Sequence, residues 1–225
     1  MKPRCSNQTN RATTLTDVLV SVAVVCVLAG IAFLILHRPK VHRIVHENRS
    51  SDIQCVNNLK QIGLAFRIWE GDNGDKPPMQ VPAKSGGAME PAARGNVARI
   101  FQVMSNELSM PKILLCPVDA DRLAAKNFTA GFDNSHVSYF AGLDANNDQP
   151  FMFLSGDGNF AVGGHPVKPG LLLLTTNAPV TWTTMRHVNQ GNIGLVDGSV
   201  RQTDDQRLVQ ELIETGVTAN RLAVP

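Results

Sequence analysis

The stretch VLVSVAVVCVLAGIAFLIL, residues 18–36, runs for nineteen positions without a charged side chain. As an α-helix it would span roughly 28 Å, which is close to the hydrocarbon thickness of a bilayer. A soluble core helix would carry polar side chains at every third or fourth position, whereas Ser21 and Cys26 are the only interruptions here. The stretch therefore predicts a helix that spans a membrane.

The leader MKPRCSNQTNRA, residues 1–12, carries three cations and no acid, and the next cation after the apolar stretch is Arg38. This asymmetry favours a cytoplasmic N-terminus, with the rest of the chain on the other side of the membrane. Two simpler interpretations stay open. One is a secretory signal peptide with Val27-Leu28-Ala29 as its cleavage site, and the other is a plain single-pass anchor.

The junction ATTLTD, residues 12–17, resembles the prepilin cleavage and methylation motif of type IV pilins and type II secretion pseudopilins, which usually reads GFTLIE. Its threonine–leucine pair matches, and Asp17 takes the acidic position. The resemblance implies cleavage by prepilin peptidase between Ala12 and Thr13, followed by N-methylation of Thr13. A carboxylate in an apolar helix needs a partner, and in such filaments the N-terminus of the neighbouring subunit provides it. Asp17 is thus the expected assembly residue.

Beyond the apolar stretch the helical pattern resumes as an amphipathic stripe that ends at Gly71-Asp72-Asn73-Gly74. The stripe consists of Val41, Val45, Ile53, Val56, Leu59, Ile62, Phe66 and Trp69. Together the two parts predict one helix over residues 14–71, about 87 Å long, with a kink at Pro39. The expected organisation is a leader (1–12), an assembly helix (13–37), the amphipathic half of the same helix (38–71) and a periplasmic head (72–225).

The head is predicted to combine short helices with short strands. A helix is expected over 96–108, and a second over 205–214, where Asp204 is the cap and Gly216 the stop. The strand-like runs are 137–140, 151–154, 171–176, 181–185, 193–196 and 199–203. The expected fold class is therefore α+β and pilin-like, with a long N-terminal helix packed on a small antiparallel sheet.

A second signature lies near the C-terminus, where His187 precedes Asp197-Gly198 by nine residues. It resembles the H-X9-DG signature of a large group of prepilin-type proteins, as do the segments CVNNLKQIG from Cys55 and LCP around Cys116. Asp-Gly between two strand-like runs also predicts a type I′ hairpin turn. His187 either bonds to this hairpin or to the Asp197 carboxylate, or it is a structural residue.

Two cysteines, Cys55 and Cys116, would face an oxidising periplasm, where they form either a disulfide or two buried free thiols. No cysteine or histidine spacing typical of a zinc site is present. Asp144, Asn146 and Asp148 place oxygen ligands at alternate positions, which makes them weak calcium candidates. The loop lacks the glycine and the glutamate of an EF-hand, so a solvated turn is the alternative.

The net charge of +2 excludes a large basic patch for nucleic acid, and no catalytic motif is found, so an enzyme is not expected. The expected function is that of a pilin-like or pseudopilin subunit, assembled with like or related pilin subunits into a type II secretion or type IV pilus filament. The expected location is the bacterial inner membrane, with a single pass, a cytoplasmic N-terminus and a periplasmic head. The alternative is a membrane-anchored or exported envelope binding module that does not polymerise.

Overall fold

The computed structural model describes residues 15–36, 41–129 and 131–225, with the side chains of 17 and 34–49 left out. The chain divides into two compact units, residues 1–45 and 46–225. The expected cleavage site, Ala12 and Thr13, lies outside the described residues, and of Asp17 only the backbone is described.

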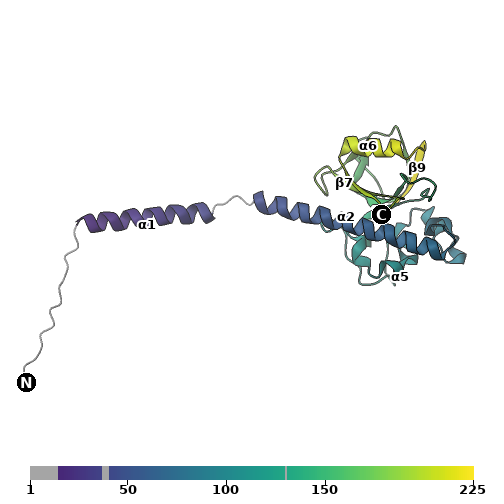
Figure 1. Cartoon of the computed structure of the whole chain (residues 1–225), viewed down its shortest axis with the longest axis horizontal. Helices are drawn as coiled ribbons and strands as arrows, with labels where there is room; N and C mark the ends of the chain where they lie inside the picture. Colours follow the sequence, from purple (N-terminus) through teal and green to yellow (C-terminus); the bar gives the residue numbers. More distant parts are fainter. Residues whose placement is uncertain (1–14, 37–40, 130) are drawn as a thin grey trace, which may run out of the picture. The chain divides into compact units, whose positions relative to one another are not determined.

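The N-terminal part contains two helices, α1 (Leu15–Leu36) and α2 (Val41–Asp72) (Figure 1). The prediction of one long helix over residues 14–71 is therefore wrong. The sequence between α1 and α2 contains Pro39, which itself lies outside the described residues. Proline has no amide hydrogen to donate and its ring clashes with the preceding turn, which disfavours an uninterrupted helix.

Among the residues described with side chains, no helix is long and apolar enough to span a bilayer. This finding contradicts the expected transmembrane helix, and with it the predicted single-pass location in the inner membrane. A span needs about 20 consecutive apolar residues in one helix, and the described side chains of α1 end at Phe33.

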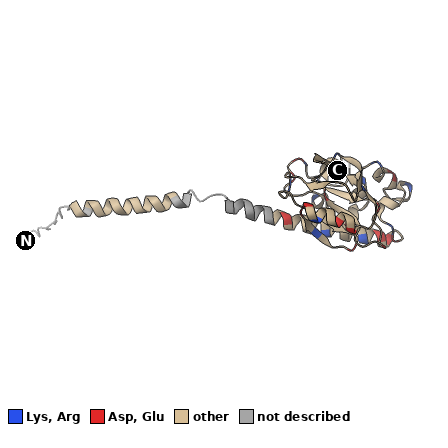
Figure 2. Cartoon of the chain, turned by 90° about the horizontal axis from the view of Figure 1, so that it is seen from above, with Lys and Arg blue, Asp and Glu red and all other residues tan. Residues whose placement is uncertain are grey.

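The part of α2 that belongs to the second unit buries one face. Cys55, Leu59, Ile62 and Phe66 are at most 1% exposed, as positions on one side of a helix can be. The predicted stripe is correct from Leu59 to Trp69 but wrong at Ile53, which is 57% exposed, and its first members lie outside the residues described with side chains. Figure 2 shows charged residues on α2 and the head, whereas the residues of α1 that are described with side chains are uncharged.

Within the part of the chain that the structure describes, nine strands form two antiparallel sheets. The larger has the order β5-β9-β1-β2-β7-β8 and the smaller the order β4-β3-β6. The strands are β1 (Tyr139–Gly142), β2 (Phe153–Asp157), β3 (Phe160–Val162), β4 (His165–Pro166), β5 (Gly170–Thr175), β6 (Val180–Trp182), β7 (Gly191–Leu195), β8 (Val200–Thr203) and β9 (Ala219–Val224).

Short helices complete the head. They are α3 (Met89–Ala92), α4 (Val97–Val103), α5 (Ser105–Leu108) and α6 (Asp205–Glu214), with 3-10 turns at Pro78–Gln80, Ala83–Ser85, Pro111–Leu114 and Asn134–His136. One core, which includes Phe66, Phe101 and Tyr139, joins α2, α4 and the sheet, and a second, which includes Phe153 and Leu212, lies under α6. Figure 1 shows α6 and α2 on opposite sides of the strands. The α+β class of the head is correct.

The observed elements agree with some of the local predictions and differ from others. The helix 205–214 is confirmed, with Asp204 accepting a hydrogen bond from the Arg207 amide (2.8 Å). The predicted helix 96–108 is divided into α4 and α5 at Met104. The type I′ turn is wrong, because such a turn needs positive φ at both central residues, and of Asp197 and Gly198 only the glycine has it (85°).

Candidate functional site

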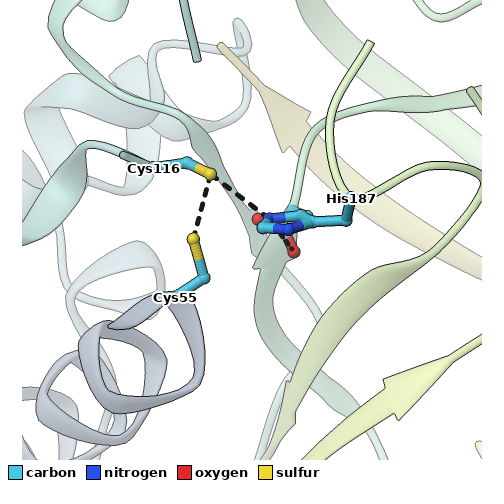
Figure 3. A group of neighbouring side chains, drawn as sticks. Cys55, Cys116 and His187 are labelled. Carbon is cyan, nitrogen blue, oxygen red and sulfur yellow. Dashed lines mark hydrogen bonds and ion pairs between the residues drawn. The ribbon is translucent and has the colours of Figure 1, made fainter. Parts of the chain in front are cut away.

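Four buried side chains from distant parts of the chain meet inside the head. Cys55 comes from α2, Cys116 follows the 3-10 turn Pro111–Leu114, Asp157 ends β2, and His187 lies between β6 and β7. Figure 3 shows the two thiols and the imidazole turned toward one another. We call these four residues the Cys2HisAsp cluster.

The potential ligand atoms of the cluster are close together. The two sulfur atoms lie 2.9 Å apart, and Sγ of Cys116 lies 3.3 Å from Nε2 of His187. The same nitrogen lies 3.7 Å from Oδ2 of Asp157. All four ligand atoms lie within 4.8 Å of one another. The cluster therefore surrounds a single point rather than forming a row of pairwise contacts.

The local structure around Cys116 holds its thiol in place. The Cys116 amide donates to Oγ of Ser138 (3.0 Å), and the Ser138 amide donates to the carbonyl of Leu114 (2.8 Å). Oγ of Ser138 in turn donates to Oδ2 of Asp119 (2.7 Å). These bonds attach the segment that carries Cys116 to the start of β1.

The segment that carries His187 is strained. Residues 187–189 have φ values of 48°, 48° and 59°, all in the left-handed region. Such a conformation is unfavourable for non-glycine residues, and most of all for a β-branched one such as Val188. Nδ2 of Asn159 donates to the carbonyls on either side, those of Arg186 (3.4 Å) and Gln190 (3.3 Å). The strained turn directs the His187 ring inward, where it is buried.

The second ring nitrogen of His187 also has a partner. Nδ1 donates a hydrogen bond to the carboxylate of Asp52, which lies three residues before Cys55 in α2. Residues at this spacing share one face of a helix. With its proton on Nδ1, the neutral imidazole presents the lone pair of Nε2 to the cluster.

Asp157 is fully buried, as are the two cysteines of the cluster. Its Oδ2 accepts hydrogen bonds from the amide and from Nδ2 of Asn192, both at 2.8 Å. Its Oδ1 is buried and has no hydrogen-bond partner among the described residues. Burial raises the pKa of the Asp157 carboxyl group.

The cluster also perturbs the other ionisable groups. The hydrogen bond from Cys55, followed by that with His187, lowers the pKa of Cys116 to about 6, whereas the pKa of Cys55 is raised by the same Cys116 bond and by burial. Burial acts against a charged imidazole, but the Cys116 bond and the Asp157 charge outweigh it and raise the pKa of His187 to about 9. The site thus favours one thiolate beside one imidazolium when no other cation is present.

The three segments that were compared with the H-X9-DG group meet at this site, through Cys55, Cys116 and His187. The Asp197-Gly198 pair of that signature lies outside the cluster. Oδ1 of Asp197 accepts from the Ser199 amide (2.7 Å) and closes the turn between β7 and β8. The side-chain partners of His187 are Asp52, Cys116 and Asp157, so the proposed bond to the hairpin or to Asp197 is not observed among the described residues.

The predicted partners Cys55 and Cys116 are adjacent, and the structure shows them as free, buried thiols.

The calcium candidates have other roles. Nε of Arg221 donates to Oδ1 of Asp144 (2.8 Å) and its backbone amide donates to Oδ2 (2.9 Å). Oδ1 of Asn146 accepts from the Asp148 amide (3.0 Å), as in an Asx turn.

Two residues of the site were missed by the sequence analysis. Asp157 belongs to the segment SGDGN, residues 155–159, which reads as a hairpin turn but is partly the buried strand β2. Asp52 looks like an ordinary polar position of an amphipathic helix. The only local signal for Asp52 was its spacing of three residues from Cys55.

Comparisons of the chain with protein-family models, with curated proteins and with solved structures gave no match.

Proposed function

We propose that the protein is a pilin-like filament subunit, processed by prepilin peptidase and assembled through α1 with other copies or related subunits. The observation that carries the proposal is that α1 is apolar and exposed on every side. Its large side chains have exposed fractions between 50% and 63% at Val18, Leu19, Val20, Val22, Val24, Val25, Val27, Leu28, Ile31 and Phe33.

Successive residues of an α-helix are about 100° apart, so neighbours such as Leu19 and Val20 point in different directions. A helix that packed on its own head would have one apolar and one polar face, as the buried face of α2 illustrates. An apolar helix without a polar face needs cover on all sides, and burial of each large side chain stabilises by roughly 1.5–3 kcal/mol. A bundle of α1 helices from several subunits provides such cover.

The head supports the same proposal because it does not need α1 for its own core. Residues 46–225 form one compact unit with two hydrophobic cores, and the residues of both cores come from within that unit. The sequence adds the junction ATTLTD and Asp17, whose carboxylate can pair with the α-amino group of Thr13 in the next subunit.

Two measurements test the proposal. Mass spectrometry of the mature protein should show an N-terminus at Thr13 with an added methyl group, and electron microscopy should show filaments. Asp17→Ala should abolish filaments, whereas Asp148→Ala, which removes an exposed carboxylate of the head, should leave them intact. A chain that begins at Gly30, or an Asp17→Ala variant that behaves like the parent, would favour an exported binding module that does not polymerise.

A further inference from the structure

We propose that the Cys2HisAsp cluster is a structural zinc site that ties α2 to the sheet of the head. The ligands are Sγ of Cys55, Sγ of Cys116, Nε2 of His187 and one carboxylate oxygen of Asp157. This site is independent of filament assembly through α1, since all four residues lie in the unit 46–225.

The number and the spacing of the ligand atoms fit zinc. Zinc prefers four tetrahedral ligands, with bonds of about 2.3 Å to sulfur and about 2.0–2.2 Å to nitrogen or oxygen, which places the ligand atoms about 3.3–3.8 Å apart. The observed separations of 2.9 Å (Cys55 to Cys116), 3.3 Å (Cys116 to His187) and 3.7 Å (His187 to Asp157) require only small shifts of the thiols to admit the ion.

A second, independent observation is the unpartnered oxygen of Asp157. This side chain is fully buried, and its Oδ1 has no hydrogen-bond donor among the described residues. Leaving such an acceptor unsatisfied is costly. The buried cation Arg186 does not supply the missing partner, because its Nη2 pairs with Asp119 (2.5 Å) and its Nη1 donates to the Ser138 carbonyl (2.9 Å). A divalent cation bound by the Asp157 carboxylate would offset this cost.

The hydrogen bond between His187 and Asp52 completes the arrangement. Histidines that bind metals usually donate their other ring N–H to a carboxylate, which fixes the tautomer and raises the basicity of the ligating nitrogen. Here Nδ1 of His187 donates to Asp52, and Nε2 faces the two sulfurs and Asp157. Asp52 is therefore a positioning residue for the metal ligand.

The ligand set also selects among metals. Calcium and magnesium prefer oxygen ligands, whereas two thiolates with an imidazole suit zinc. All four ligands are buried, so the coordination sphere is closed, as in structural rather than catalytic zinc sites. On binding, the site releases two protons to solvent, one from the Cys55 thiol and one from the Cys116–His187 pair, and no electron is transferred. The ion would join segments that are up to 132 positions apart, which stabilises the folded head over the unfolded chain.

The test uses the full chain, purified under reducing conditions in mild detergent and without chelator. Elemental analysis should find one zinc per chain. Replacement by cobalt should give the visible absorption of a tetrahedral thiolate site. Removal of the metal with a chelator should lower the melting temperature, and added zinc should restore it.

Variants assign the ligands. Cys116→Ser and His187→Gln should each lose the bound zinc or weaken its binding at least tenfold, whereas Cys26→Ser, in α1, should keep it. Circular dichroism reports whether each variant is folded. The measurements on the parent chain decide the proposal even if a variant unfolds. A metal-free parent in which Cys55 and Cys116 both react with a thiol reagent overturns it, as does a parent whose mass is lower by two hydrogens, because a Cys55–Cys116 disulfide would then occupy the site.

Discussion

The imidazole of His187 donates a hydrogen bond from Nδ1 to the carboxylate of Asp52, 135 positions earlier in the chain. This bond links the strained turn between β6 and β7 to the first described turns of α2. It also leaves Nε2 of His187 directed at the thiols and at Asp157. The helix and the sheet thus share one buried polar site.

Asp52→Ala should weaken zinc binding while leaving all four ligands in place. Loss of a carboxylate behind a ligating histidine typically costs 10–100-fold in metal affinity, and we expect a change of about that size. Competition with a chromophoric chelator measures it. Asp148→Ala removes an exposed carboxylate away from the cluster and should bind zinc like the parent. Equal zinc affinities of the parent and Asp52→Ala would show that Asp52 does not position the metal ligand.

The buried carboxylate of Glu211 in α6 pairs with two arginines, and either one alone should be enough to keep its charge paired. Arg201 Nη1 lies 2.7 Å from Oε2 of Glu211, and Arg207 Nε lies 2.6 Å from Oε1. Either Arg201→Met or Arg207→Met leaves one cation in place. The double variant leaves a buried charge unpaired, which costs about 3–5 kcal/mol.

Urea unfolding of the parent, the two single variants and the double variant measures this coupling. We expect the double variant to lose more free energy of unfolding than the two single losses combined. Additive losses would mean that Glu211 is not held jointly by the two arginines.

Gly142→Ala should be strongly destabilising because β1 and β2 approach closely there. A Cβ at position 142 would lie 1.9 Å from the carbonyl oxygen of Phe153. Overpacking of this kind costs about 1–3 kcal/mol, and displacement of backbone places it at the upper end. Gly63→Ala is the matched control, because a Cβ at that position of α2 would meet nothing within 4 Å.

In a helix, alanine is more favourable than glycine by roughly 0.5–1 kcal/mol. The two substitutions should therefore shift the melting temperature in opposite directions. A Gly142→Ala variant as stable as the parent would contradict the close approach of β1 and β2.

Glu70→Gln should stabilise the head at neutral pH. Burial raises the pKa of Glu70 in the folded state, while its side chain keeps a 3.4 Å hydrogen bond from Nδ2 of Asn147. An acid with a raised folded pKa favours folding while it is protonated. That contribution is complete below the unfolded pKa and is lost as the pH rises through the folded pKa.

At pH 7 the ionised carboxylate of Glu70 therefore lowers the free energy of unfolding. Glutamine removes that cost and can still accept from Asn147, so we expect a gain of up to about 1 kcal/mol. Urea unfolding between pH 4 and pH 7 should show a flatter pH dependence for Glu70→Gln than for the parent. A parallel pH dependence would mean that Glu70 does not contribute to it.

Elements that depend on short-range patterns could be predicted from the sequence. The helix α6 is one, because Asp204 and Gly216 mark its two ends within a few residues. Six of the nine strands overlap the predicted strand-like runs. The strands β3, β4 and β9 were not predicted, and β9 pairs with both β5 and β1. Such pairings depend on contacts between distant segments, and a local sequence pattern contains no information about those contacts.

The sequence by itself determined that residues 18–36 are apolar all round and that the later turns of α2 carry one apolar face. Only the tertiary structure decided that Cys55, Cys116 and His187 meet, that Asp157 and Asp52 join them, and that Asp197 does not. The physical reason is that helical periodicity is encoded by side chains three and four positions apart. The Cys2HisAsp cluster depends instead on the pairing of β2 with β7 and on the packing of α2, which involve the whole head.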